Sequence, residues 1–371
     1  MPQLPRPAPR VAERRVAPLP GRVPRQARAA REARHADPHR ALRAVKLEPP
    51  FLGDERIPLD LAIERASCCV CGPAAASDAA ARGYDYEYRT SRRAWIYRRC
   101  RECALVYLDP RPAVAELGRI YPPNYYSFDE GKRGNALVAH FRRRLEAGKA
   151  RAFARLAGPG AKRVLDVGCG DGRFLAVLRD HGPREWTLEG IDIDAAAVAR
   201  ARADGLSVGC SRLEDFAAGA ARYDLVVLFQ TLEHVSDPRD TCRKIRGLLN
   251  PGGLCVIETP DVAGWDERLF RAGLWGGYHI PRHWNLFTPD NLARLLEQQG
   301  FEVVERTPLI STSFWINSLY NALLVRGAPG WLLRFFHYQN PALLALFIAL
   351  DKLRMACGAR TSNQRIVARA R

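Results

Sequence analysis

The stretch Val164–Leu175, VLDVGCGDGRFL, decides the fold: an apolar run ends in an aspartate and breaks into three glycines before a helical pattern begins. From residue 163 onward, strand-like and helix-like segments alternate. We expect strands near 163–168, 186–191, 206–209, 224–229, 253–259 and 301–307, and helices near 172–181, 195–204, 238–249 and 289–299. This alternation predicts an α/β fold with a doubly wound parallel sheet, in which ligands bind at the carboxyl ends of the strands.

Two classes of ligand compete for the glycine loop. A dinucleotide fingerprint requires the spacing G-x-G-x-x-G, with a pyrophosphate at the start of the helix. Here Gly168, Gly170 and Gly172 have the spacing G-x-G-x-G, and Asp166 stands two residues before the first glycine. A carboxylate at that point repels a pyrophosphate but suits a ligand that carries an amino group or a sulfonium.

Those residues, together with the next four motifs along the chain, resemble the class I S-adenosylmethionine-dependent methyltransferases, whose Rossmann-like fold and activity the resemblance implies. LDVGCGDG matches the first motif of the family, GIDIDAAAVARAR the second, and SRLEDF the adenine contact; YDLVVLFQTLEHVSDP and LLNPGGLCVIETPD match the fourth and fifth strands. The resemblance implies that Asp166 holds the amino end of the cofactor and that Asp192 accepts hydrogen bonds from the ribose. The expected cofactor-binding residues are Asp166, Gly168, Cys169, Gly170, Gly172, Asp192, Ile193, Leu213, Glu214, Gln230 and Glu233, with Asp215 and His234 close by.

Each of these residues also has a structural interpretation. Asp166 could cap the following turn, and Glu233 with His234 could fix the geometry of a loop. Asp194 is better explained as the N-cap of the helix that begins at Ala195.

Methyl transfer is an in-line displacement, so a base is needed only where the acceptor must lose a proton. The segment GYHIPRHWNLFTPDNL, residues 277–292, lies where related enzymes place acceptor-binding residues. His283 is the first candidate for the catalytic base and His279 the second, with Tyr278, Arg282 and Trp284 as candidate substrate contacts. A histidine beside a tryptophan in a loop is also a common structural feature.

Four of the ten cysteines form two pairs, Cys68-x2-Cys71 and Cys100-x2-Cys103, separated by 28 residues that include strand-like YDYEYRT and AWIYRR. Four thiolates close a tetrahedral zinc site and leave no position open for substrate. We therefore expect a small ribbon with structural zinc; a ribbon without metal and a redox pair are the alternatives. Cys69 is a spare thiol beside the first pair.

The formal net charge is +17, and residues 1–50 carry 12 Lys/Arg against 4 Asp/Glu. This Pro/Arg-rich segment has no apolar periodicity, so we expect disorder. It lacks the apolar region of a secretory signal, and its prolines argue against a transit peptide. No aromatic residues interleave the arginines, so nucleic acid is not the expected partner. A start assigned too early is a further explanation.

The segment 314–360 is rich in aromatic and aliphatic residues and lies where the family has a tight hairpin before the last strand, NQRIVARAR. Its longest apolar run, Ala342–Leu350, has 9 residues, too few to span a bilayer, which takes about 20. Helices lying in a membrane interface, with Lys352, Arg354 and Arg360 near anionic lipid, are one interpretation. A helical lid or a dimer surface is the other.

These observations divide the chain into a basic segment (1–50), a zinc-ribbon-like domain (51–110), a connector with a helix (111–160) and a methyltransferase domain (161–371). In the connector, Tyr121, Tyr125 and Tyr126 are expected to pack rather than to line a cleft. The cysteine-paired ribbon is similar to that of bacterial methyltransferases that act on sugars or surface polysaccharides, whereas LEHVSDP resembles quinone-biosynthesis O-methyltransferases.

The leading hypothesis for the function is methylation of a sugar, a polysaccharide precursor or a lipid-linked glycan. A soluble small molecule or a quinone-type metabolite is the alternative acceptor, and a non-catalytic cofactor-binding scaffold is the alternative of another class. Ten cysteines without a secretory signal favour a reducing compartment. We therefore expect a cytoplasmic enzyme, peripheral on the inner face of the membrane if 314–360 binds lipid. The oligomeric state stays open.

Overall fold

The structure is a computed structural model that describes residues 48–122, 136–216, 222–337 and 340–371. The predicted disordered segment therefore lies outside the described residues up to residue 47, as do Tyr125 and Tyr126.

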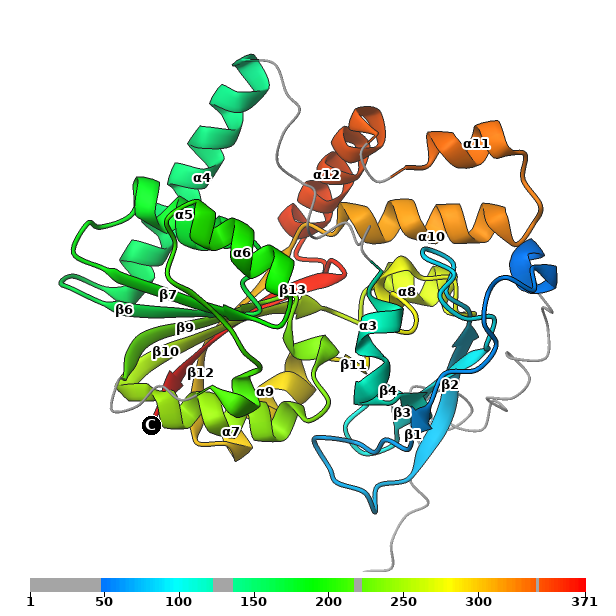
Figure 1. Ribbon diagram of the computed structural model, residues 1–371, viewed down its shortest axis with the longest axis horizontal. Coiled ribbons are helices and arrows are strands. Elements are labelled where there is room, and N and C mark those ends of the chain that lie inside the picture. The colour runs from blue at the N-terminus through cyan, green and yellow to red at the C-terminus, as the bar shows by residue number, and fades with distance from the viewer. Residues whose placement is uncertain (1–47, 123–135, 217–221, 338–339) are drawn as a thin grey trace, which may run out of the picture.

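A seven-stranded sheet lies beneath helices α4–α6 in Figure 1. Its strands, in spatial order, are β12 (Phe301–Leu309), β13 (Asn363–Ala370), β10 (Leu249–Pro260), β9 (Tyr223–Phe229), β6 (Arg163–Val167), β7 (Thr187–Asp192) and β8 (Val208–Cys210). Strands β10, β9, β6, β7 and β8 are parallel, and β13 runs antiparallel to both of its neighbours. The predicted doubly wound α/β sheet is confirmed, with element ends shifted by a few residues.

Helices cover both faces of this sheet (Figure 1). One face carries α4 (Ala136–Ala157), α5 (Arg173–His181) and α6 (Ala195–Ala203), and the other carries α7 (Pro238–Leu248) and α9 (Pro289–Gln298). Consecutive residues of one strand serve the two cores: Val164 packs with Phe153 and Phe174, whereas Leu165 packs with Ile245 and Leu296. Burial on both faces explains why these strands read as continuous apolar runs.

The amino-terminal part forms a smaller sheet of β2 (Ser77–Gly83), β3 (Trp95–Cys100) and β4 (Val106–Leu108). The fourth strand of this sheet, β11 (Asn285–Leu286), comes from the part of the chain between β10 and α9. A two-stranded sheet of β1 (Ile63–Glu64) and β5 (Arg111–Pro112) precedes α3 (Leu117–Ile120). Because β11 completes the small sheet, the two parts share backbone hydrogen bonds. The division at residue 110 stays a prediction.

One strand of this small sheet was placed wrongly from the sequence. YDYEYRT, residues 84–90, is not a strand; β2 ends at Gly83 and a turn comes next. The reason is Asp85, whose buried carboxylate accepts from the backbone N–H groups of Tyr88 and Thr90 at 3.0 and 2.9 Å. A side chain that binds its own backbone in this way favours a turn over a sheet ladder.

Three helices lie between β12 and β13: α10 (Thr312–Leu324), α11 (Gly330–Phe335) and α12 (Pro341–Ala356). Both α11 and α12 pack on α10. Within the described ranges, none of the helices combines the length and the apolar character needed to traverse a bilayer.

Candidate functional site

The glycine loop joins β6 to α5 in a conformation that only glycine adopts easily. Gly168, Gly170 and Gly172 have φ values of +74°, +56° and +77°. The N–H of Gly168 donates to the carbonyl of Ile191 at 2.8 Å, which fixes the loop against the end of β7. A Cβ on Gly168 would lie 2.5 Å from Thr231 Oγ1, whereas one on Gly170 would meet nothing within 4 Å. Gly170 therefore borders open space.

Asp192, the last residue of β7, is tied to this loop. Its Oδ2 accepts from the Gly170 N–H at 2.7 Å and its Oδ1 from the Asp194 N–H at 2.8 Å. Burial raises the pKa of the Asp192 carboxyl. Asp194 itself caps α6, because its side chain accepts from the N–H groups of Ala196 and Ala197, as predicted.

Asp166 lies inside β6, 2% exposed, two residues before the loop. Burial raises its pKa to about 7, although the ammonium of Lys149 acts in the opposite direction. Lys149 in turn lies over the rings of Phe174 and Phe229, 4.9 and 4.2 Å from their centroids. A buried carboxylate of this kind is stabilised by a further cation. The open space beside Gly170 and the charge of Asp166 together fit a ligand with an ammonium group.

The next part of this edge is a single 3₁₀ turn, Leu213–Asp215. Ser211, just before it, donates its N–H to the carbonyl of Asp192 at 3.0 Å. Leu213 is buried, and Glu214 forms an ion pair with Arg212 at 3.4 Å. The turn therefore lies next to the Asp192 end of β7.

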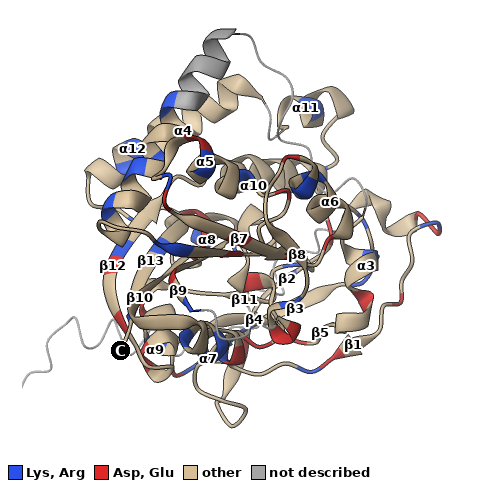
Figure 2. Ribbon diagram, turned by 60° about the vertical axis from the view of Figure 1, so that its left-hand side comes forward, with Lys and Arg blue, Asp and Glu red and all other residues tan. Residues whose placement is uncertain are grey.

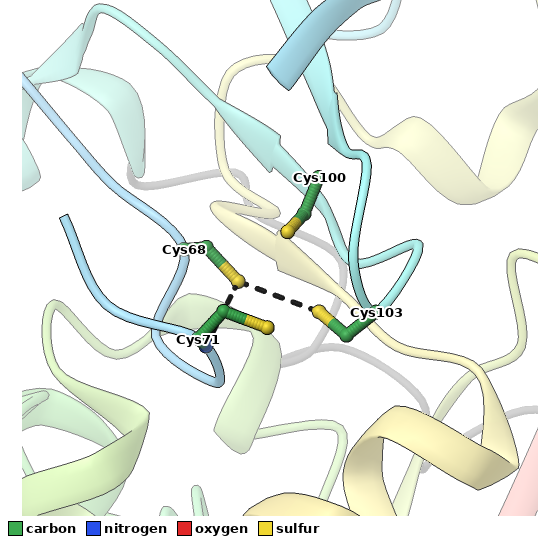
Figure 3. Close-up of side chains that lie close together, drawn as sticks. All are labelled: Cys68, Cys71, Cys100 and Cys103. Carbon is green, nitrogen blue, oxygen red and sulfur yellow. Dashed lines mark hydrogen bonds between the residues drawn. The ribbon is translucent and has the colours of Figure 1, made fainter. Parts of the chain in front are cut away.

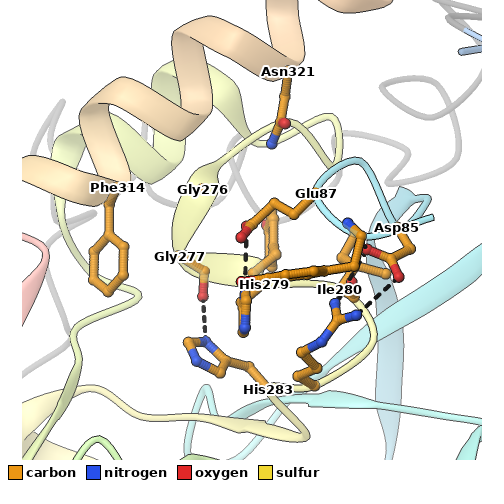
Figure 4. Close-up of polar contacts among 12 residues, drawn as sticks. Asp85, Glu87, Gly276, Gly277, His279, Ile280, His283, Phe314 and Asn321 are labelled. Carbon is orange, nitrogen blue, oxygen red and sulfur yellow. Dashed lines mark hydrogen bonds and ion pairs between the residues drawn. The ribbon is translucent and has the colours of Figure 1, made fainter. Parts of the chain in front are cut away.

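A second group of candidates lies on the loop between β10 and α9, which includes the 3₁₀ turn Gly276–Tyr278. Amino-terminal residues hold this loop in place. The Tyr97 hydroxyl donates to the carbonyls of Tyr278 and His283 at 2.8 and 2.7 Å. His279, with φ +39°, places Nδ1 3.1 Å from Glu87 Oε1 (Figure 4).

Arg282 anchors this loop through a buried ion pair. Its guanidinium donates to both carboxylate oxygens of Asp85 at 3.1 and 3.0 Å, and both side chains are fully buried. Burial alone would raise the pKa of Asp85, but the adjacent guanidinium of Arg282 outweighs it and holds the pKa below its ordinary value. The pair fastens the loop to the amino-terminal sheet.

His283 faces Glu233, which lies in the 3₁₀ turn Leu232–His234 after β9. His283 Nε2 lies 4.0 Å from Glu233 Oε1, and His283 Nδ1 lies 2.8 Å from the Gly277 carbonyl. Glu233 Oε2 accepts from the Thr259 hydroxyl at 2.9 Å, while Oε1 has no hydrogen-bond partner among the described residues. The carbonyl fixes the proton of His283 on Nδ1, so the lone pair is on Nε2, the ring nitrogen that lies 4.0 Å from the unsatisfied carboxyl oxygen.

The pKa values of this group are shifted in opposite directions. Burial raises the pKa of Glu233 to about 8. Burial, together with the neighbouring imidazoles of His234 and His279, lowers the pKa of His283 well below its usual range, and burial lowers that of His234 to about 3. Both of these imidazoles are therefore neutral near pH 7. Together with Glu233 their nearest donor atoms lie within 4.8 Å of one another, a set that could also hold a divalent cation.

The four predicted zinc ligands meet in one place (Figure 3). Cys68, Cys71, Cys100 and Cys103 place their sulfurs within 4.8 Å of one another, and the sulfurs of Cys68 and Cys103 are 3.4 Å apart. Four thiols on two turns match the donor set of a closed tetrahedral zinc site. Cys69 stands outside the four. Arg239 of α7 donates to the carbonyl of Cys69 at 3.1 Å, which fastens the first pair to the large domain.

Comparison with known proteins identifies the family of this chain. A family model described as a methyltransferase domain matches residues 138–306. The ubiquinone biosynthesis O-methyltransferase of Aromatoleum aromaticum is 32% identical over 169 residues, which cover 41% of this chain and 68% of that protein. The chain belongs to the class I S-adenosylmethionine-dependent methyltransferases.

The ubiquinone biosynthesis O-methyltransferase of Cereibacter sphaeroides is also 32% identical, over 164 residues that cover 40% of this chain. The chain spans 63% of the length of that relative, a little under two thirds. A solved methyltransferase structure from Thermotoga maritima is 15% identical, covers 63% of this chain and 92% of that one, and has a TM-score of 0.40. The cysteine pairs and helices α10–α12 lie outside the stretch that the family model matches.

Three further residues predicted to bind the cofactor of this methyltransferase lie along the same edge. Cys169 lies in the loop, where its sulfur would be 2.8 Å from a Cβ on Gly190, and Ile193 is the residue after Asp192, with 56% of its surface exposed. Gln230 adopts φ +50° and donates to Asn363 Oδ1 at 3.1 Å, so its amide is directed to the start of β13.

The three candidate substrate contacts have polar groups that bind within the protein. The Tyr278 hydroxyl donates to Glu267 at 2.8 Å, and Trp284 Nε1 donates to the Pro281 carbonyl at 3.0 Å. The guanidinium of Arg282 binds Asp85. Asp85, Glu87 and Tyr97 were not predicted from the sequence as parts of this site; they stand about 180–200 positions from their partners. No local pattern could have signalled contacts of that range.

Proposed function

We propose that this methyltransferase transfers a methyl group to a hydroxyl of a ring-type small molecule, and that His283, with Glu233 beside it, receives the hydroxyl proton. When bound, S-adenosylmethionine supplies the methyl group on a positively charged sulfur. Asp166 and the glycine loop suit its amino end, and Asp192 suits the ribose hydroxyls. The observation that carries the proposal is the unsatisfied Glu233 oxygen opposite His283 Nε2.

A ring hydroxyl must lose its proton at or before attack, so an O-methyltransferase needs a base within reach. The neutral His283 imidazole can accept that proton at Nε2 because the Gly277 carbonyl holds the other ring proton on Nδ1. An ionised Glu233 then stabilises the resulting imidazolium at close range. Burial of both side chains keeps water from competing for the proton.

The names of the relatives favour a quinone-type acceptor over a sugar. The relatives from Aromatoleum and Cereibacter are both ubiquinone biosynthesis O-methyltransferases, and the family model covers the part of the chain that carries Glu233 and His234. The sugar or lipid-linked glycan that led our expectations therefore ranks second. The sugar or glycan acceptor is still supported by the cysteine-paired ribbon. We propose that this ribbon holds a structural zinc ion.

The test measures transfer of labelled methyl from S-adenosylmethionine by the purified full-length protein. The acceptors are a catechol with an isoprenoid side chain, a nucleotide sugar and a lipid-linked glycan fraction. We expect label in the catechol, and none with Asp192→Ala. Label only in the glycan fraction would overturn the ranking, and label in no acceptor would count against all three substrate classes.

Variants of the proposed base sharpen this test. His283→Gln is expected to lower kcat by about 100-fold or more while the Kd for S-adenosylmethionine is unchanged. Because Glu233 acts when ionised and its pKa is about 8, wild-type kcat is expected to rise with pH through about 8, and Glu233→Gln should remove that rise. His181→Gln, on α5, is the matched control. Activity of His283→Gln within about threefold of wild type would show that another group receives the proton.

A further inference from the structure

Helix α12 exposes an apolar stripe. The residues at Ala342, Ala345, Leu346, Ala349, Leu353 and Ala356 are all exposed and succeed one another at helical spacing. The opposite side of the helix is buried, and there the ring of Phe347 stacks on that of Trp315 at 5.5 Å. A helix that is apolar on both sides normally has both sides covered. The outer stripe therefore points to a partner.

Helix α11, which precedes α12 in the chain, exposes two aromatic side chains. None of its residues is buried, and Trp331 and Phe335 are 72% and 49% exposed. In Figure 1, α11 lies above α10, and α12 rises beside the left-hand end of α10. We call the exposed residues of α11 and of the α12 stripe the helical surface.

The exposed charged side chains of this segment are all basic. Arg326, Arg334, Lys352 and Arg360 are exposed, and Arg360 lies 4.0 Å from the exposed carboxylate of Asp290. Figure 2 colours the Lys and Arg residues of α11 and α12 blue. Between residues 312 and 360 the sequence has a single acidic residue, Asp351. Asp351 is fully buried, where it accepts from Ser311, Trp315 and Arg354. This segment thus presents apolar groups among cations without a compensating exposed carboxylate of its own.

We infer that the helical surface docks on an anionic lipid bilayer, with Trp331 and Phe335 at the level of the headgroups. Aromatic side chains prefer this level, and basic residues beside them gain from anionic lipid. Helix α12 then lies parallel to the bilayer, because no described helix can traverse it. A second copy of the chain is a poorer occupant, because it would bring the exposed cations Arg326, Arg334 and Lys352 of the two copies together. The inference does not depend on which acceptor is methylated.

Sedimentation of the full-length protein with vesicles tests this docking. The vesicles are phosphatidylcholine alone, or phosphatidylcholine with roughly one third phosphatidylglycerol. We expect binding to the anionic vesicles, and a loss of about tenfold in the double variant Trp331→Ser with Phe335→Ser. The matched control is Val304→Ser, an exposed apolar residue of β12, which should bind like wild type. The basic residues 1–50 are present in every variant, so only the difference between variants counts.

Quenching of tryptophan fluorescence by brominated acyl chains supplies a second readout that does not depend on the amount bound. Among the described tryptophans, the two exposed ones are Trp331 and Trp265, at 72% and 45%. Quenching should be lost in Trp331→Phe and kept in Trp265→Phe. Equal binding of the wild type and the double variant would overturn the inference. A second result would also overturn it: the protein binds no vesicles but dimerises, and Leu346→Glu abolishes the dimer. The stripe would then be a self-association surface.

Discussion

The cofactor edge, which is the loop 168–172 with Asp192, and the acceptor loop, residues 276–284, are built in different ways. At the cofactor edge, Gly168, Gly170 and Asp192 come from two consecutive strand ends, where backbone N–H groups of the loop bind the end of β7. The acceptor loop, by contrast, depends on side chains of the amino-terminal sheet: Tyr97 and Asp85 reach residues 278–283 across more than 180 positions of sequence.

This difference assigns a purpose to the amino-terminal part. Strand β11 adds to the small sheet shortly after His283, and Asn291 at the start of α9 donates to the carbonyl of Cys103 at 3.1 Å. The cysteine cluster and the proposed base are thus parts of one hydrogen-bonded unit. Disruption of the cysteine cluster should therefore destabilise the acceptor loop more than the cofactor edge.

Removal of metal from the cysteine cluster is expected to have the largest effect. We expect one zinc per chain by elemental analysis, and structural zinc contributes about 10 kcal/mol to small zinc domains. Chelation or Cys100→Ser should therefore increase hydrogen exchange of residues 276–284 strongly, with less change at residues 163–175. A protein that contains no zinc and keeps both segments protected would contradict this. Cys357→Ser, which changes an exposed cysteine in the segment 314–360, is the control.

Loss of the buried ion pair comes next. Arg282→Ala leaves the Asp85 carboxylate buried without its partner, and such a change costs about 3–5 kcal/mol of unfolding free energy. The matched control is Arg306→Ala, which breaks an exposed pair with Asp290 and should cost less than about 1 kcal/mol. Denaturant unfolding measures both. Equal values for the two variants would mean that the acceptor loop does not depend on the amino-terminal sheet.

The same contrast explains how far the sequence could predict this molecule. Asp166, the three glycines and Asp192 form local motifs with fixed spacing, so their positions at strand ends could be predicted from the pattern of strands and helices. The cysteine pairs could be predicted equally well, since two Cys-x2-Cys pairs must come together to close one site. The roles of Asp85 and Glu87 could not be predicted in this way. The alternating aromatic residues of YDYEYRT predict a strand, but the Asp85 carboxylate binds the backbone of the following residues and stabilises a turn.

The cofactor edge and the acceptor loop should also respond differently to pH, and this effect is smaller. Because the folded-state pKa of Asp166 is about 7 against an ordinary value of 3.8, its contribution to stability is complete below about pH 4 and is lost as the pH rises through about 7. A cationic ligand binds the ionised form, so its affinity should change in the opposite sense.

We therefore expect affinity for S-adenosylmethionine to rise by roughly tenfold between about pH 5.5 and pH 7, where the ligand amino group stays protonated. Titration calorimetry measures this rise, which Asp166→Asn should abolish and Glu233→Gln should leave intact. A rise that survives in Asp166→Asn would place the titrating group elsewhere on the cofactor edge.

The finest test concerns Asp194, which touches the cofactor edge without being expected to bind the cofactor. Its side chain caps α6, and its backbone N–H holds Asp192. Asp194→Ala removes the cap but keeps the N–H, so it should lower stability by about 1 kcal/mol and leave the Kd for S-adenosylmethionine unchanged. Asp237→Ala, which removes the equivalent cap of α7, should cost a similar amount. A tenfold loss of affinity in Asp194→Ala alone would show that this carboxylate contacts the cofactor, and that the edge depends on more side chains than its backbone hydrogen bonds indicate.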